Sequence, residues 1–164
     1  MKITKKLAIS QKECFDTIIN SVLHDVKQTT GKKPLVQKLE GMKFKRKMAN
    51  GSEAIMIITK CTPPEVYEFQ TKTHVNTHTT RYTIENTSEH TCEVVYDETV
   101  EAKTAMARWN NILVGGILGF TRKKRITRTL AGIEAYIIQQ HKELAAKIEK
   151  IKARPAYQTP RNTL

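Results

Sequence analysis

The order of apolar and polar positions begins with a short alternating run and continues with a helical one. Apolar and polar residues alternate from Ile3 to Ile9, which predicts a β-strand. Ser10 and Glu13 follow with the spacing of a capping box, in which each side chain bonds the backbone N–H of the other residue. Apolar residues then recur at helical spacing as far as Val26, and Gly31 is a suitable end. We therefore expect a helix over this segment.

The middle of the chain, residues 35–101, changes to a period of two. Asn50-Gly51-Ser52 is a hairpin signal, and Pro63-Pro64 ends the β-rich run that begins at Glu53, because proline cannot donate to a central ladder. Three more β-rich runs cover residues 66–73, 77–86 and 92–101, with turn-type residues between them. This pattern predicts an antiparallel meander.

From about residue 112 the period returns to 3.6. Gly115 and Gly116 predict a kink or a helix start, because glycine costs about 1 kcal/mol relative to alanine inside a helix. Residues 1–153 are expected to form one domain, and residues 154–164, with two prolines, a disordered tail. The predicted class is α+β, with a curved antiparallel sheet gripping a long C-terminal helix. The stripe expected on that helix consists of Ile126, Leu130, Ile133, Ile137, Leu144, Ile148 and Ile151.

The net charge of +12 is unevenly distributed. Residues 1–101 contain 15 Lys or Arg and 13 Asp or Glu, whereas residues 102–164 contain 13 and 3. An anionic partner fits this asymmetry, whether nucleic acid, a phosphorylated ligand or a membrane surface, and so does a solvated helix face. The basic residues lack interleaved aromatics and a recognition-helix motif, so we expect no sequence-specific nucleic-acid binding.

Cysteine content and hydropathy indicate in which cellular compartment the protein is expected. The chain contains three cysteines, far apart and without a C-x-x-C motif, which argues against a disulfide framework and favours a reducing cytoplasm. No run of 18 apolar residues is present, so no transmembrane segment is expected.

The order of elements, together with NGSEAIMIITKCTPPEVYEF (50–69), resembles the START-like superfamily, also called SRPBCC or helix-grip. RYTIENTSEHTCEVVYDETVEA (81–102) is similar to the last hairpin of such domains. The chain also resembles an uncharacterised bacterial branch, a domain of unknown function found near sugar-phosphotransferase genes. The superfamily resemblance implies a hydrophobic cavity between the sheet and the C-terminal helix that holds an apolar or amphipathic small molecule.

The polar side chains on the predicted strands do not form a recognisable catalytic or metal-binding pattern. His74 and His78 could share a strand face, but they straddle a predicted turn, so we expect surface residues and no metal site. The carboxylates Glu93, Asp97, Glu98 and Glu101 are explained by a solvated strand face, and no convergent acid–base pair is evident. We therefore expect no catalysis and no cofactor, although an enzyme of the cyclase or hydrolase type is a weaker alternative.

Aromatic residues and methionines are better candidates, either as ordinary core or as the lining of a ligand pocket. On a helical wheel centred on Leu130, Gly119 and Lys123 turn toward the sheet, whereas Lys124, Arg125 and Arg128 face water. Lys123 either snorkels to solvent or binds an anionic ligand at the pocket mouth. The candidate ligand-binding residues are Met42, Phe44, Tyr67, Phe69, Tyr82, Tyr96, Trp109, Gly116, Gly119 and Lys123.

The function that best fits these expectations is non-catalytic binding of a small apolar or amphipathic ligand, anionic if Lys123 contacts it. The alternative is a regulatory protein–protein interaction module that uses the basic face of the C-terminal helix, with Arg125 and Arg128.

Overall fold

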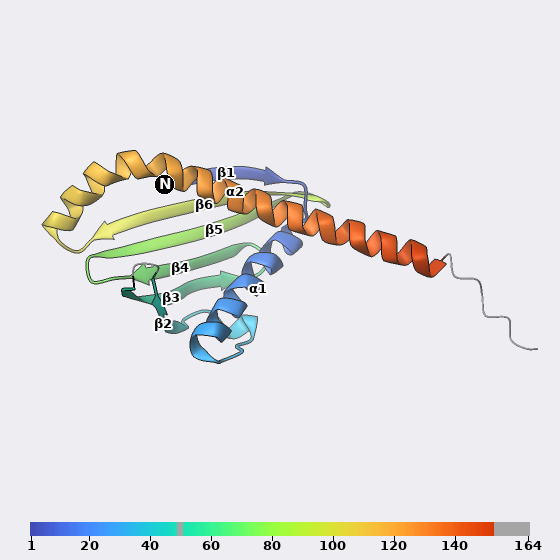
Figure 1. Ribbon diagram of the computed structural model, residues 1–164, viewed down its shortest axis with the longest axis horizontal. Coiled ribbons are helices and arrows are strands. Elements are labelled where there is room, and N and C mark those ends of the chain that lie inside the picture. Colours follow the sequence, from blue (N-terminus) through green and yellow to red (C-terminus); the bar gives the residue numbers. More distant parts are fainter. Residues whose placement is uncertain (49–50, 153–164) are drawn as a thin grey trace, which may run out of the picture.

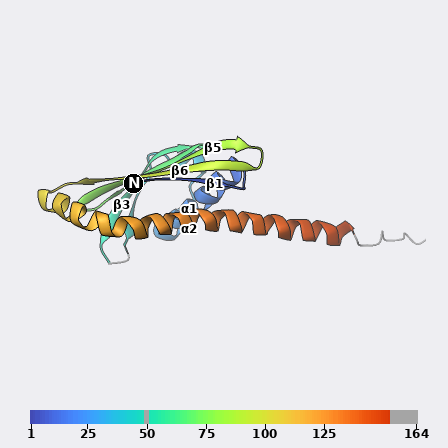
Figure 2. The same ribbon diagram turned by 90° about the horizontal axis from the view of Figure 1, so that it is seen from above.

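The computed structural model describes the backbone of residues 1–48 and 51–152, and the side chains of the same residues apart from 105–118. The six strands form one antiparallel sheet in the order β1-β6-β5-β4-β3-β2, and both long helices lie on the same face of it (Figures 1 and 2). The elements are β1 (Lys2–Leu7), α1 (Gln11–Thr30), a 3-10 helix η1 (Val36–Lys38), β2 (Lys43–Lys47), β3 (Glu53–Thr62), β4 (Val66–Lys72), β5 (Asn76–Ser88), β6 (Thr91–Ala102) and α2 (Ala105–Lys152). The predicted α+β class, a curved antiparallel sheet with a long C-terminal helix, is confirmed.

Helix α1 begins and ends at the residues that the sequence indicated. The Ser10 N–H donates to the Glu13 carboxylate at 2.9 Å, and the Glu13 N–H donates to the Ser10 hydroxyl at 3.3 Å, which completes the capping box. Gly31 follows the helix with φ of 71°, in the left-handed region where glycine has no Cβ penalty. The carboxyl group of Glu13 has its pKa lowered, first of all by the hydrogen bond from Ser10.

The core lies between α1 and the face of the sheet that carries the helices, here called the inner face. Antiparallel partners share a face, so the pairs Leu7–Cys92 and Ile84–Val94 point the same way. These side chains pack against the apolar stripe of α1, which includes the fully buried Cys14 and Phe15. Cys14 therefore lies on the buried side of this helix.

Helix α2 differs from the sequence expectation at its start. It begins at Ala105 and continues without a break through Gly115 and Gly116, which were expected to mark a kink or a helix start. Two glycines in a helix of 48 residues can be tolerated, because the neighbouring turns keep their hydrogen bonds. Its N-terminal half curves over the end of the sheet, and its C-terminal part extends beyond the sheet (Figure 1).

Apolar packing and polar contacts together hold α2 on the rest of the fold. Leu130 is 0% exposed in the core, and Arg122 forms an ion pair with Glu98 of β6. Glu134 Oε1 accepts the N–H of Ala8 at 2.6 Å, and His141 Nε2 lies 2.6 Å from Glu13 Oε1 at the start of α1. The helix is therefore fixed from residue 122 to residue 141. Among the described residues, no helix is long and apolar enough to cross a membrane.

Candidate ligand-binding site

A row of aromatic side chains crosses the inner face from β4 to β6. The register places Tyr67 opposite Tyr82 and Tyr82 opposite Tyr96, so the three rings point the same way. Ring centroids lie 5.5 Å apart for Tyr67–Phe69, 6.3 Å for Tyr67–Tyr82 and 5.1 Å for Tyr82–Tyr96. These separations are typical of favourable aromatic pairs. Tyr67 and Tyr96 are buried, whereas Phe69 and Tyr82 remain partly exposed.

The other predicted lining residues are more scattered. Phe44 on β2 is buried opposite Met56 of β3, and Met42, just before β2, is partly buried against the same cluster. Gly119 of α2 is also partly exposed, and a Cβ built on it would meet no atom within 4 Å, so there is open space beside it. Trp109 and Gly116 belong to the part of α2 whose side chains lie outside the described residues.

Beside the aromatic row lies a charged cluster centred on Glu98. Glu98 follows Tyr96 by two positions on β6, which places both side chains on the inner face, and Glu98 is only 7% exposed. The Tyr96 hydroxyl donates to Glu98 Oε2 at 3.3 Å. Glu98 Oε1 lies 3.5 Å from His78 Nδ1 and also accepts from Arg122 Nη2. The carboxylate is therefore contacted from β5, β6 and α2.

These partners determine the ionisation of Glu98. Burial alone would raise the pKa of its carboxyl group, but the hydrogen bond from His78, the positive charge of Arg122 and the bond from Tyr96 lower the pKa overall. Glu98 is consequently ionised at neutral pH. Burial, assisted by the charge of Glu98, raises the pKa of Tyr82 to about 12, so this phenol is a neutral hydrogen-bond donor.

The interpretation of Glu98 and His78 from sequence was therefore wrong. Glu93 and Asp97 are half-buried and Glu101 is exposed on the outer face, as a solvated strand face requires, but Glu98 belongs to the opposite face. His78 was expected at the surface and is 28% exposed, with its ring directed at Glu98. The signal was present in the alternation, because Glu98 has the parity of Val94 and Tyr96.

Among the described side chains of α2, the basic residue that reaches the sheet is Arg122, and the predicted residue, Lys123, is exposed. The helical wheel was extrapolated over seven residues from Leu130, whereas the observed row runs through Gly119, Arg122, Ile126 and Leu130. Successive members of this row are three or four residues apart. Because α2 is curved, the side of the helix that faces the sheet changes along its length, and a wheel drawn for a straight helix does not follow it.

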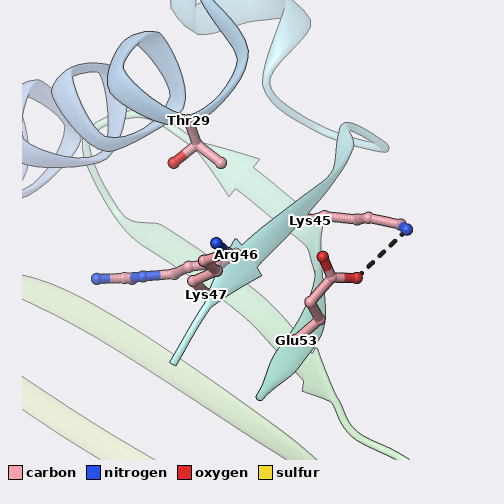
Figure 3. A pocket seen from close by; sticks show the side chains of 5 residues that line it. All are labelled: Thr29, Lys45, Arg46, Lys47 and Glu53. Carbon is pink, nitrogen blue, oxygen red and sulfur yellow. Dashed lines mark hydrogen bonds and ion pairs between the residues drawn. The ribbon is translucent and has the colours of Figure 1, made fainter. Parts of the chain in front are cut away.

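A basic hollow lies between the end of α1 and β2, with a volume of about 420 Å³ (Figure 3). It is lined by Thr29, Lys45, Arg46, Lys47 and Glu53. Lys45 Nζ lies 3.3 Å from Glu53 Oε2, and Arg46 Nη1 lies 3.0 Å from Asp25 Oδ2, so two of its three cations already have a carboxylate partner. β2 is an edge strand, and lysines on an edge strand disfavour edge-to-edge pairing, so their presence is explained without a ligand.

Within the described residues, no three His, Cys, Asp or Glu side chains come together as possible metal ligands. His74 is exposed, and His78 is directed at Glu98. The described part of the site can therefore offer phenol, imidazole, guanidinium and carboxylate groups beside an apolar wall, but no preformed metal centre.

Solved structures with a similar fold have little sequence identity to this chain. Norcoclaurine synthase from Thalictrum flavum, solved with a transition-state analogue, has a TM-score of 0.57 and 9% identity over 86% of this chain and 94% of that chain. A conserved protein from Geobacillus kaustophilus has a TM-score of 0.51 and 13% identity over 80% and 93%. A START superfamily protein from Mycobacterium smegmatis has a TM-score of 0.43 and 13% identity over 79% and 97%. At these identities the likeness to the first two structures shows the fold alone.

The sequence itself has no match among curated proteins. A family model described as "Domain of unknown function (DUF3284)" matches residues 1–119, which include β1 to β6, α1 and the start of α2. The match covers the whole sheet with Glu98 and the aromatic row, and the chain therefore belongs to the DUF3284 family.

Proposed function

We propose that the protein binds a small amphipathic molecule, without catalysis, between the inner face of the sheet and α2. The observation that carries this proposal is that Phe69 and Tyr82 stay partly exposed on the inner face, beside a buried, ionised carboxylate. Pockets for small molecules combine an apolar wall with a few fixed polar groups, and this surface has both.

The chemistry of the cluster suggests how such a ligand would be oriented. Its apolar part would lie on Phe69 and Tyr82, and its polar end would approach Arg122 and His78, whose side chains are 38% and 28% exposed. A guanidinium has five N–H donors, and Glu98 occupies only part of them. A hydroxyl, carbonyl or carboxylate on the ligand would therefore find free donors. Trp109, Gly116 and Gly119 would belong to the roof, while Lys123 would contact only an anionic group outside it.

Filling the space beside Gly119 should weaken binding. We expect Gly119→Leu to reduce the affinity for an amphipathic naphthalene-sulfonate dye at least tenfold, because the added side chain occupies the space over the inner face. The dye's fluorescence titration measures this, and native mass spectrometry of protein purified from its own host would show a retained natural ligand directly.

Gly132→Leu is the matched control. Gly132 lies on the same helix, is exposed, and also has no atom within 4 Å of a built Cβ. Both changes should raise helix propensity by about the same amount, up to 1 kcal/mol, so they differ chiefly in which face they fill. Equal dye affinity of the two variants, or no saturable binding by the unaltered protein, would contradict the proposal.

The second candidate function uses the outer face of α2. Lys124, Arg125 and Arg128 line a shallow groove with Thr121 and Thr129, and in the described part of the chain none of these three basic side chains forms an ion pair. Unpaired cations on one helix face fit a regulatory partner with an acidic surface. Arg125→Glu with Arg128→Glu is expected to abolish recovery of such a partner in a pull-down while leaving dye binding intact. Loss of both would indicate misfolding and count against this surface.

A further inference from the structure

Helix α2 continues past its last contact with the fold. The last hydrogen bond or ion pair between α2 and the remaining elements, among the described residues, is that of His141 with Glu13. Residues 142–152 are all exposed, and Figures 1 and 2 show this end of the helix running beyond the edge of the sheet. We call residues 142–152 the overhang. An isolated helix of this length is marginal in water, so a partner that covers its apolar side would stabilise this end of α2.

The overhang carries an apolar stripe that no described residue of the chain covers. Leu144, Ile148 and Ile151 are 57%, 44% and 68% exposed. Their spacing of four and three places them within about 60° of one another on the helix. They continue the row that is buried at Leu130 and Ile137 where α2 lies on the fold. The same stripe thus packs on the domain in one half of the helix and faces solvent in the other.

The charges beside this stripe indicate what kind of surface covers it. Lys147 and Lys152 lie on its two sides, within about 80° of Leu144, whereas Glu143 and Glu149 are about 100° or more away. A second copy would be repelled in either orientation. Parallel pairing places Lys147 opposite Lys152 of the other copy, and antiparallel pairing about Leu144 and Ile148 places Lys147 opposite Lys147. The net charge of +12 adds to this repulsion.

We propose that the overhang is a docking site for an amphipathic helix of another protein whose apolar seam is flanked by acidic residues. Such a helix would bury Leu144, Ile148 and Ile151 and place carboxylates opposite Lys147 and Lys152. This surface is separate from the basic outer face of α2 and from the small-molecule site, so it is independent of both functions proposed above.

Two synthetic peptides test the proposal on the full chain. Both form the same leucine-seamed helix, one with glutamate and the other with lysine at the positions that flank the seam. Fluorescence anisotropy should show binding of the glutamate peptide at least tenfold more tightly than the lysine peptide, with a difference that shrinks at high salt. Equal binding of the two peptides, no binding of either, or a stable dimer of the protein in sedimentation velocity would overturn the proposal.

Variants of the overhang locate the site. Leu144→Ser with Ile148→Ser should weaken binding of the glutamate peptide at least tenfold, and Ala146→Ser, on the opposite side of the helix, should leave it unchanged. Because serines could unwind a marginal helix, Lys147→Glu with Lys152→Glu provides a second measurement. That variant should prefer the lysine peptide. An unchanged preference would show that these lysines do not select the partner.

Discussion

Replacing Glu98 by glutamine is expected to lower the free energy of unfolding by about 2 kcal/mol at pH 7. Glu98 is 7% exposed and accepts from Tyr96, His78 and Arg122, so the change removes the charge that these donors surround. Glutamine has nearly the same shape, which limits the loss of packing. The effect stays below that of a fully buried ion pair, because Arg122 and His78 retain access to water.

The pH dependence of this difference identifies its cause. The folded-state pKa of Glu98 is lowered, so its contribution is fully present above the unfolded pKa of about 4.3 and is lost as the pH falls through the lower folded value. Urea denaturation should therefore separate the unaltered protein from Glu98→Gln near pH 7 and bring them together in acid.

Glu101→Gln is the control, since Glu101 is an exposed carboxylate on the same strand. It should change stability by no more than about 0.5 kcal/mol. If Glu98→Gln were as mild as this control, the cluster would contribute nothing to the attachment of α2 to the sheet.

The fold could be predicted because its signals are local and repeated. The capping box of Ser10 and Glu13, the end at Gly31 and the two-residue period of the strands each depend on a few neighbouring residues, and each is observed. The same alternation places Tyr67 and Phe69 on one face, and the observed register then brings Tyr67, Tyr82 and Tyr96 side by side. The periodicity of the sequence indicates which residues share a face of a helix or strand. The hydrophobic content of each face then indicates which of the faces is buried.

The charged cluster could not be predicted in the same way, because it depends on distances between elements far apart in sequence. Alternation alone places Glu98 with Tyr96, but only the path of α2 brings Arg122 over β6. That path depends on the curvature of a long helix, and a small error in its rotation exchanges Arg122 with Lys123. The acidic residues of this strand therefore suggested that Glu98 is solvated, whereas the fold buries it.

The inner face has two parts of different chemical character. Under α1 it is filled by apolar side chains such as Ile84 and Val94, which are almost completely buried. Toward the start of α2 it carries Phe69, Tyr82 and the Glu98 cluster, which cost more to bury and pack less tightly. The first half supplies most of the apolar burial, and the second half is where we propose that the ligand binds. Helix α2 must then stay docked over both halves.

Leu130→Ala should undock that helix. We expect a loss of about 3 kcal/mol in the free energy of unfolding, because Leu130 is 0% exposed and its truncation leaves a cavity beneath α2. Dye affinity should fall with it, since the proposed site has α2 as its roof. Leu144→Ala is the matched control, because it makes the same substitution on the same helix at a side chain that is 57% exposed. It should leave stability and dye binding nearly unchanged, and it should weaken binding of the glutamate peptide. Thermal denaturation and the two binding titrations on both variants separate these effects. If Leu130→Ala lowered stability but kept full dye affinity, the dye site would lie away from α2, and the proposed roof would be wrong.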